Sequence, residues 1–441
     1  MIFDSNSLKT LFIKIITKMK LKLLNFILFS IFSYTVSFAQ NQQNDSIAPF
    51  NLRFQMTSVY QYHPAFKADY SGNNSLQNHE EKALSLTSTL FFDMPLWKGA
   101  TISLNPEMSG GEGVSGAKGL GGFANGETFR IGQTKPVVYM ARMLLEQKID
   151  LGINQSLQFV IGKFGLSDYF DGNTFCHDPR TQFLNWSLMT HGAWDYAANT
   201  RGYTDAIYAN YQLDTWQIRA SIAALPTTAN GPNVEFNFNK SNAINVEVEK
   251  EMNFKNNDKA IIRVLGFKNV AKMGNYNQAS SSFIGTPNII STRADGRTKY
   301  GLGINGEYSH GEQWGAFGRI SYNDGKNETW AFTEIDQSAS LGINLKGKMW
   351  NRKDDFGGIA IATNGLSKDH QKYQQLGGNG FMIGDGNLNY GTEEIAEAFY
   401  SFNVPHSHIT LSPDYQYIIN PGYNRDRGPV QFLSLRFHTE F

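Results

Sequence analysis

Several short clusters in this 441-residue chain carry side chains that could bind a cofactor, hold a metal or cleave a bond. The string Gly111-Glu112-Gly113-Val114-Ser115-Gly116 has the glycine spacing of a dinucleotide-binding turn. Such a turn must open a helix, because the first amides of that helix bind the pyrophosphate. The chain continues Ala117-Lys118-Gly119-Leu120-Gly121-Gly122, which is too rich in glycine to hold a helix. We therefore interpret this segment as a loop without a nucleotide site.

The run Cys176-His177-Asp178 groups three residue types that ligate metals. Adjacent residues cannot all turn to one ion, and no second cluster in the sequence supplies the missing ligands. Cys176 is also the only cysteine, so an intrachain disulfide is impossible. We expect neither a metal nor another cofactor.

Four aspartates lie close together in the sequence, at positions 168, 171, 178 and 195. A pair of such carboxylates could hydrolyse a glycosidic bond. Carboxylates on a loop also hydrogen-bond the loop to neighbouring structure, and we favour that interpretation. Neither a Gly-x-Ser-x-Gly elbow nor a His-Glu-x-x-His motif occurs. The sequence therefore favours a protein that is not an enzyme.

The composition indicates which elements position these residues. Aromatic residues make up 13% of the chain and 42 residues are glycine, yet the mean hydropathy is −0.36 and no long apolar run follows residue 38. A helical membrane protein is therefore excluded, whereas a membrane β-barrel fits, because only alternate residues of its strands touch lipid. Lys plus Arg and Asp plus Glu each number 39, and this balance argues against a nucleic-acid partner.

Alternation of apolar and polar residues predicts strands throughout the chain. The clearest example is Val430–Phe441, where Leu435 and Phe437 share one face and Arg436 lies on the other. Sixteen such strands are predicted, near 52–60, 83–92, 99–107, 137–149, 155–163, 203–213, 215–224, 243–252, 258–267, 299–309, 314–322, 338–348, 357–364, 391–402, 407–418 and 430–441.

The connections between these strands alternate in length. After odd-numbered strands they are long: 61–82, 108–136, 164–202, 225–242, 268–298, 323–337, 365–390 and 419–429. After even-numbered strands they are short: 93–98, 150–154, residue 214, 253–257, 310–313, 349–356 and 403–406. Outer-membrane barrels have long extracellular loops, short periplasmic turns and an even strand count. The pattern thus predicts an all-β, antiparallel up-and-down transmembrane barrel of 16 strands. In it, the last strand pairs with residues 52–60, Leu435 faces lipid and Arg436 faces water.

The domain organisation follows from the N-terminus. Residues 1–39 are interpreted as an N-terminal extension and a cleaved signal peptide, with a basic segment before an apolar one and cleavage before Gln40. Met1 and Met19 are both candidate starts. Residues 40–51 form a periplasmic segment and 52–441 a single barrel domain in the cell outer membrane.

Charged residues in the strands are expected to face a water-filled lumen, because a charge against lipid would cost several kcal/mol. The predicted lumen set is Arg142, Lys163, Arg219, Glu247, Arg263, Glu307, Arg319, Glu397 and Arg436. Both signs occur, so strong ion selectivity is not expected. A lumen that combines such charges with aromatic rings suits neutral, hydroxyl-rich solutes such as sugars.

Several longer stretches carry a family resemblance. They are Gln61–Phe66, Tyr70–Leu76, Pro106–Gly111, Gly122–Glu127, Asp168–Asn173, His177–Trp186, Asp195–Ala198, Arg201–Thr204, Gly384–Gly386, Glu393-Glu394 and Pro413–Gly422. Through them the chain resembles the carbohydrate-selective porin family (OprB type) from near residue 61 to its C-terminus.

The resemblance implies a sixteen-stranded porin through which mono- and oligosaccharides diffuse passively. It implies that inward-folded loops, with 108–136 and 164–202 as candidates, narrow the lumen, and that Phe441 is read by the barrel-insertion machinery. The partners are then the lipid bilayer and the transported sugars, and the protein is a monomer or a homo-oligomer. A general or anionic-solute porin, a barrel-borne hydrolase and an adhesin-like structural barrel are the alternatives.

We assign a constriction to Glu107, Arg142, Asp171 and Arg180 as a hypothesis. The remaining candidate pore-lining residues are Arg219, Arg263, Glu307, Arg319, Glu397 and Arg436.

Overall fold

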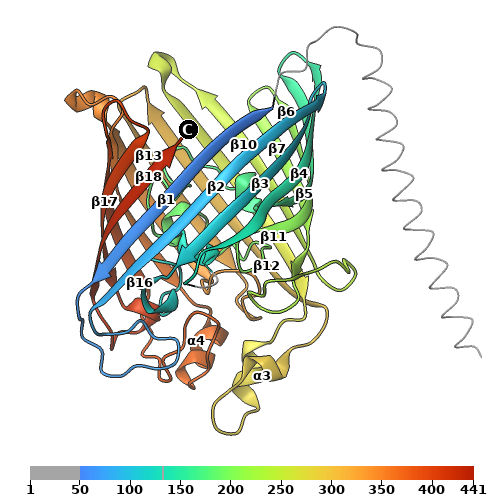
Figure 1. Cartoon of the computed structure of the whole chain (residues 1–441). Coiled ribbons are helices and arrows are strands. Elements are labelled where there is room, and N and C mark those ends of the chain that lie inside the picture. The colour runs from blue at the N-terminus through green and yellow to red at the C-terminus, as the bar shows by residue number, and fades with distance from the viewer. Residues whose placement is uncertain (1–49, 132–133) are drawn as a thin grey trace, which may run out of the picture.

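A computed structural model of the chain shows a closed antiparallel β-barrel of sixteen strands (Figure 1). The structure describes residues 50–131 and 134–441. The predicted signal segment 1–39 and all but the last two residues of the predicted segment 40–51 lie outside these described residues.

The barrel strands follow one another around the wall in sequence order. They are β1 (Asn51–His63), β2 (Glu81–Trp97), β3 (Ala100–Gly111), β4 (Val137–Gly152), β5 (Gln155–Phe164), β6 (Thr204–Leu213), β7 (Trp216–Ala223), β10 (Asn242–Asn253), β11 (Lys259–Ala271), β12 (Arg297–His310), β13 (Trp314–Asn323), β14 (Gln337–Lys346), β15 (Phe356–Gly365), β16 (Glu393–Asn403), β17 (Ile409–Ile419) and β18 (Val430–Glu440). The described connections also contain the hairpin β8 (Leu225–Pro226) and β9 (Val234–Glu235), the α-helices α2 (Trp186–Met189), α3 (Tyr276–Ser281) and α4 (Lys368–Gln375), and the 3-10 turns η1 (Val114–Gly116), η2 (Thr128–Arg130), η3 (Leu166–Asp168), η4 (Lys255–Asn257), η5 (Ile289–Thr292), η6 (Gly347–Trp350) and η7 (Pro421–Tyr423).

The barrel closes where the first strand pairs with the last. Tyr60 lies opposite Leu435 in the β1–β18 ladder, and Val59 lies opposite Arg436. Leu435 is half exposed on the outer face, so the predicted pairing and the lipid-facing side are confirmed. Closure leaves neither β1 nor β18 with an open edge, which is what a sheet in hydrocarbon requires.

All sixteen predicted strands correspond to barrel strands, and the alternation of long and short connections is confirmed. Several strands extend further than predicted. β2, for example, runs through to Trp97, with a bulge between Pro95 and Trp97, because the ladder continues past the point where apolar alternation ends. The hairpin β8–β9 was not predicted, since strands of two residues are too short to show a period.

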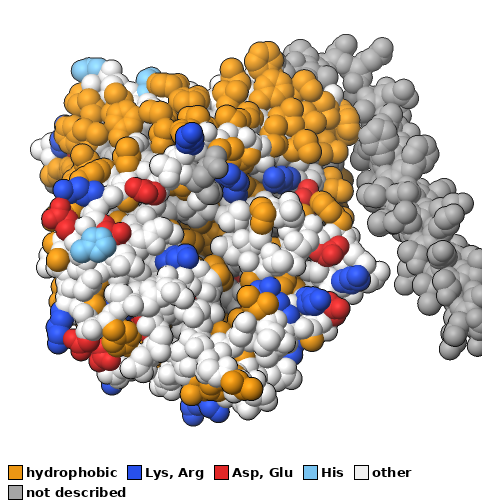
Figure 2. Space-filling view, turned by 60° about the horizontal axis from the view of Figure 1, so that its bottom comes forward, with side chains coloured by type: hydrophobic (Ala, Val, Ile, Leu, Met, Phe, Trp, Pro, Cys, Tyr) orange, Lys and Arg blue, Asp and Glu red, His pale blue; other side chains and the backbone are white. Residues whose placement is uncertain are grey.

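Apolar side chains alternate to the outside of the wall. Ile320, Leu341 and Ile359 are each more than half exposed, and they lie on three neighbouring strands. Figure 2 shows a band of hydrophobic side chains on the barrel wall, while charged side chains of both signs are scattered over the loop end. This band marks the surface that contacts the lipid of the bilayer.

The prediction that Lys163 faces the lumen is wrong. It has the same parity in β5 as Phe159 and Ile161, which are both exposed on the outer face. Lys163 lies near the loop end of β5 and opposite Asp205 in the register. A long side chain at that height reaches the aqueous boundary, and Asp205 places an opposite charge beside it.

The long connections gather at one end of the barrel, together with α3 and α4, and the C-terminus lies at the other end (Figure 1). Among residues 50–131 and 134–441, no helix is long and apolar enough to cross a bilayer.

The lipid-facing assignment of the last strand predicts how substitutions there change stability. Leu435→Arg lies in the middle of β18 and should lower the free energy of unfolding by roughly 2–4 kcal/mol. Gln431→Arg, an exposed position near the loop end of the same strand, should cost about 0–1 kcal/mol. Denaturant unfolding in lipid vesicles measures both. Equal losses for the two variants would contradict the assigned membrane depth of Leu435.

Candidate functional site: the loop-lined lumen

The interior of the barrel is occupied by chain rather than by water alone. Connection 165–203, between β5 and β6, folds inward, and its helix α2 lies against β14 and β15. Most of this connection has irregular backbone, whose N–H and C=O groups need partners once they are removed from bulk water. The barrel wall supplies those partners from its inward-facing side chains.

Wall carboxylates bind the backbone N–H groups of this connection. The accepting residues are Glu247 (β10), Glu307 (β12) and Glu397 (β16), and the donating N–H groups are those of Asp171, Thr174, Leu184 and Asn185, at 2.5 to 2.9 Å. Glu247 and Glu307 also pair with arginines of the wall, and hydrogen bonds to carboxylates in such ion pairs are stronger than neutral ones. Two nearby strands, β10 and β12, and the more distant β16 thus hold the connection in place.

Wall arginines bind its carbonyl groups. Arg319 of β13 donates to the carbonyl oxygens of Leu188 (2.7 Å) and Cys176 (2.8 Å), and its Nε donates to the carboxylate of Asp171 (2.9 Å). Arg436 of β18 donates to the carbonyl oxygens of Pro179, Thr181 and Gln182. Arg436 is fully buried by these contacts, so the prediction that it faces water is wrong, although it does point inward.

A ladder of alternating charges crosses four strands of the wall. In order it consists of Glu247, Arg219, Glu249, Arg263 and Glu307, with successive N···O distances of 2.5, 2.9, 2.7 and 3.4 Å. Because each charge has a partner of opposite sign, the ladder can stay largely out of water. Its two ends, Glu247 and Glu307, are the same residues that hold connection 165–203.

A second ionic cluster lies around Glu107 on β3. Arg180 reaches it from connection 165–203 at 3.0 Å, and Arg130 of η2 lies 3.8 Å away. Glu127 pairs with both arginines, at 3.0 and 3.4 Å. Tyr203 adds a hydrogen bond from its hydroxyl to Glu107 at 3.0 Å. The cluster therefore joins both inward-folded connections to the same part of the wall.

Arg142 forms a more open pair. Its guanidinium donates to both carboxylate oxygens of Asp168 in η3, at 2.7 and 2.5 Å. The two side chains keep 15% and 27% of their surface exposed. Tyr169 lies next to them and is only partly buried, with its ring packed against that of Tyr208 at 4.6 Å between centroids. This part of the lumen combines exposed charge with an aromatic face.

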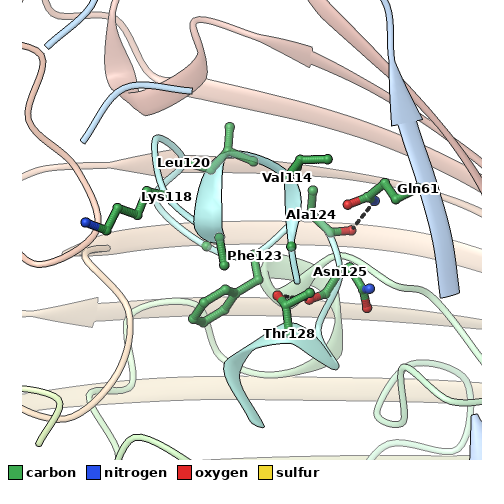
Figure 3. Close-up of a pocket in the computed structure, with 11 residues that line it drawn as sticks. Gln61, Val114, Lys118, Leu120, Phe123, Ala124, Asn125 and Thr128 are labelled. Atoms are coloured by element: carbon green, nitrogen blue, oxygen red, sulfur yellow. Dashed lines mark hydrogen bonds between the residues drawn. The ribbon is translucent and has the colours of Figure 1, made fainter. Parts of the chain in front are cut away.

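The glycine-rich connection after β3 packs tightly against the wall. Ala124 O accepts hydrogen bonds from Gln416 (2.7 Å) and from Gln61 (3.4 Å), and Figure 3 shows Gln61 reaching towards it from β1. The pocket that the loop encloses, lined by Gly113 and Val114 among others, has a volume of only about 10 Å³. A pocket of that size holds about one water molecule. The glycine string therefore forms a packed loop here, and this pocket has no room for a nucleotide.

The other sequence clusters also have structural partners. Asp195 accepts hydrogen bonds from the backbone N–H groups of Trp330, Ala331 and Phe332, so it holds connection 324–336. Cys176 is buried, and its thiol donates to Leu188 O at 2.9 Å. Within the described part of the chain, no group of three or more His, Cys, Asp and Glu side chains is arranged to hold a metal ion.

A pair of acids on neighbouring strands converges in the lumen. Glu397 and Asp414 are neighbours on β16 and β17, and both are buried. Glu397 already binds two backbone N–H groups of connection 165–203. A hydrolytic pair needs access to substrate and water, and this pair is closed off by the loop.

The ten candidate residues named from the sequence all lie on the inside of the barrel or on connection 165–203. The structure brings Glu107 together with Arg180, and Asp171 together with Arg319. Glu249 joins Arg219 to Arg263, and Arg263 in turn pairs with Glu307. It places Arg142, Glu397 and Arg436 in separate contacts. Sequence reasoning missed Glu127, Arg130 and Glu249. Glu249 could have been found from its parity with Glu247, whereas irregular loops offer no period that would point to Glu127 or Arg130.

The sequence matches the family described as "Carbohydrate-selective porin, OprB family" over residues 95–441. The chain belongs to this family. It is therefore a porin of the outer membrane, selective for carbohydrates as the family description states, and a channel rather than an enzyme. No curated protein sequence matches the chain.

A solved structure of an outer-membrane channel shares the fold. The high-pH structure of Pseudomonas putida OprB superposes with a TM-score of 0.70 at 18% identity, over 89% of this chain and 94% of that one. The DcaP channel of Acinetobacter baumannii gives a TM-score of 0.49 at 12% identity, over 91% and 99%. At these identities the likeness to the P. putida porin supports the fold, and the family match supports the function.

The single cysteine provides a probe of how firmly connection 165–203 is held. Burial raises the pKa of the Cys176 thiol, and both features slow its reaction with a maleimide. Arg319→Gln removes charged hydrogen bonds worth about 1.5–3 kcal/mol, so labelling of Cys176 should accelerate by roughly 10- to 100-fold. Lys163→Gln, on the outer rim, is the matched control and should leave the rate unchanged. An Arg319→Gln rate equal to that of the unmodified protein would show that Arg319 does not hold the loop.

His191 in the same connection predicts a pH dependence. Burial lowers its pKa to about 4, although Asp171 opposes this shift, and Arg319 and Arg263 add to it. The unfolded loop, with an ordinary histidine, takes up a proton below about pH 6.5, whereas the folded loop does so only near pH 4. Packing of the loop should therefore weaken as the pH falls through this window and be unaffected above it.

Hydrogen exchange of residues 170–195 by mass spectrometry, corrected for the intrinsic pH dependence, measures this effect. His191→Gln should flatten the response between pH 7 and pH 4. The same pH response in His191→Gln as in the parent would exclude His191 as its cause.

Proposed function

We propose that sugars pass by passive diffusion along a strip between connection 165–203 and the wall formed by β4 to β7. The proposal rests on the exposed fraction of the charged side chains in this region. Side chains of Glu146, Asp168, Arg142 and Arg219 retain 22%, 27%, 15% and 12% of their surface in this region. The remaining candidate residues are almost completely enclosed by the loops.

This assignment revises the constriction inferred from the sequence. Arg142 stays in it and is joined by Asp168 and Arg219. Glu107 and Asp171 have at most 1% of their surface exposed, so we assign them the role of holding the loops that narrow the route. Arg180 bridges Glu107 and Glu127 and belongs with them.

The chemistry of the strip suits a sugar. Carboxylates and guanidinium groups can exchange hydrogen bonds with successive hydroxyl groups, and the partly exposed ring of Tyr169 offers a flat apolar surface for a pyranose face. Because both signs of charge are present, neither anions nor cations are strongly favoured. The second candidate, a general or anionic-solute porin, has less support, because the guanidinium groups of Arg142 and Arg219 are ion-paired with Asp168, Glu247 and Glu249.

We further propose that residues 1–39 direct export and that Phe441 is the signal read during barrel insertion. The Phe441 side chain is 63% exposed at the short-turn end of β18, where its ring stacks on Phe54 at 5.8 Å between centroids. An exposed terminal aromatic is available to an assembly factor before the barrel closes. Both a monomer and a homo-oligomer are compatible with the outer wall.

Solute flux tests the function. Vesicles containing the mature protein should swell in neutral mono- and disaccharides faster than in charged solutes of equal size. Flux equal to that of empty vesicles would end the porin proposal for this chain. A preference for anions of equal size over neutral sugars would favour the second candidate.

Tyr169→Ala tests the route. Loss of the ring should weaken sugar-dependent block of the single-channel current severalfold while leaving the open conductance unchanged or higher. Tyr211→Ala is the matched control, because Tyr211 shares the outward parity of Ile207 on β6. If both variants keep the full block, sugars do not pass against Tyr169.

A further inference from the structure

A pronounced hollow lies in the lipid-facing wall. It has a volume of about 530 Å³ and crosses strands β14 to β18. Small side chains lie within it: Gly357, Ala398 and Pro413. Larger ones surround them: Ile343, Leu345, Trp350, Ile359, Tyr400, Tyr415 and Leu433. We call this feature the wall groove.

The wall groove begins at the short-turn end of β14 and runs to Tyr415 and Leu433, near the middle of β17 and β18. Leu345 lines it one residue before the end of β14, and Trp350 lines it from the following turn, 347–355. This turn is the longest of the seven that join neighbouring barrel strands at this end. In outer-membrane barrels this end faces the periplasm, so the groove opens onto the inner leaflet.

The turn next to the groove is basic. Between positions 346 and 355 it carries Lys346, Lys348, Arg352 and Lys353 against Asp354 and Asp355. We call this segment the basic turn. Cationic side chains at a membrane surface attract anionic headgroups, and each contributes about 1 kcal/mol.

Two of these cations, Lys346 and Lys353, form no close ion pair with a described residue, although the charge of Lys346 also acts on the carboxylate of Glu312. Arg352 is held by Asp355 at 2.7 Å and stacks over the outward-facing ring of Phe402. Lys348 pairs with Glu312, but both side chains are mostly exposed, so the pair is weak. Lys346 and Lys353 make no ion pair with any residue that the structure describes.

Apolar and aromatic groups connect the turn to the groove. Met349 is 54% exposed, and the indole of Trp350 donates to the hydroxyl of Tyr400 at 3.0 Å. Tryptophan and tyrosine prefer the boundary between lipid chains and headgroups. The groove therefore continues from hydrocarbon depth to the headgroup level, where the basic turn lies.

We propose that the wall groove and the basic turn together bind one phospholipid with an anionic headgroup from the inner leaflet. One acyl chain lies in the groove between Ile343 and Leu433, and the phosphate binds Lys346 and Lys353. A second copy of this chain could also cover the groove. Only a lipid, however, carries an anionic phosphate directly beside an apolar chain, which matches the juxtaposition of turn and groove. This inference rests on the membrane barrel and is independent of the sugar route.

Native mass spectrometry of the full mature protein, released from detergent with added phosphatidylglycerol, tests the proposal. The parent should retain one phosphatidylglycerol and bind phosphatidylcholine more weakly. The double variant Lys346→Gln, Lys353→Gln should lose roughly thirtyfold in affinity. Lys98→Gln with Lys255→Gln, at exposed positions in two other turns, is the charge-matched control and should bind as the parent does.

Filling the groove tests the acyl chain separately. Ala398→Phe should abolish retention of the lipid, whereas Ala220→Phe, an outward alanine on β7, should not. Heat-modifiable migration on gels shows that each variant is folded.

Three results would overturn the proposal. The first is equal retention by Ala398→Phe and the parent, and the second is equal affinity for phosphatidylcholine and phosphatidylglycerol. The third is a change in subunit number caused by Ala398→Phe, which would show that a second copy occupies the groove.

Discussion

A loop inside a β-barrel must find partners for its backbone polar groups, and charged side chains provide them in this protein. The wall cannot offer its own backbone, because every strand is already paired on both sides. Glutamates therefore accept from loop N–H groups, and arginines donate to loop carbonyls, as Glu397 and Arg319 do for connection 165–203. The same device recurs at the loop end, where Glu334 accepts from the N–H groups of Met382 and Ile383. The shape of the lumen depends on this interaction.

The arrangement accounts for the balance of charge in the chain. A glutamate buried alone against a loop would be costly, and its removal from water is offset only if cations lie beside it. The ladder from Glu247 to Glu307 meets this condition by alternating sign across four strands. Close packing then completes the attachment. Gly315 on β13 illustrates this, because a Cβ at that position would lie 1.9 Å from the ring of Phe175. Ionic and steric contacts thus fix the same loop.

The wall could be predicted from the sequence and the interior could not. Alternation has a fixed period, so Leu435 and Tyr60 could be assigned to neighbouring strands on the basis of residue type alone. The position of a charged residue in the alternation, however, shows only whether its side chain points into the barrel or out of it. Arg436 points inward as expected but is covered by three loop carbonyls. This burial depends on where an irregular segment 254 to 257 residues away in the sequence folds. Lys163 shows the opposite failure, because a charge near the aqueous boundary is tolerated on the outer face. Burial inside the lumen depends on how the loops fold against the wall. It distinguishes the residues that hold the loops from those that contact the solute.

Selectivity in such a lumen depends on how much charge remains available after the loops are attached. If all of the inward charges faced water, the channel would present strong local fields and would favour ions over neutral solutes. Most are instead neutralised in pairs and enclosed, and those that retain exposure, such as Arg142 with Asp168, are themselves ion-paired. A neutral solute loses little hydration free energy when such paired groups replace its water, because these groups can still donate and accept hydrogen bonds at their exposed edges. An ion loses more, since no unpaired countercharge compensates for its lost hydration. The interaction that holds the loops in place therefore also favours uncharged, hydroxyl-bearing solutes.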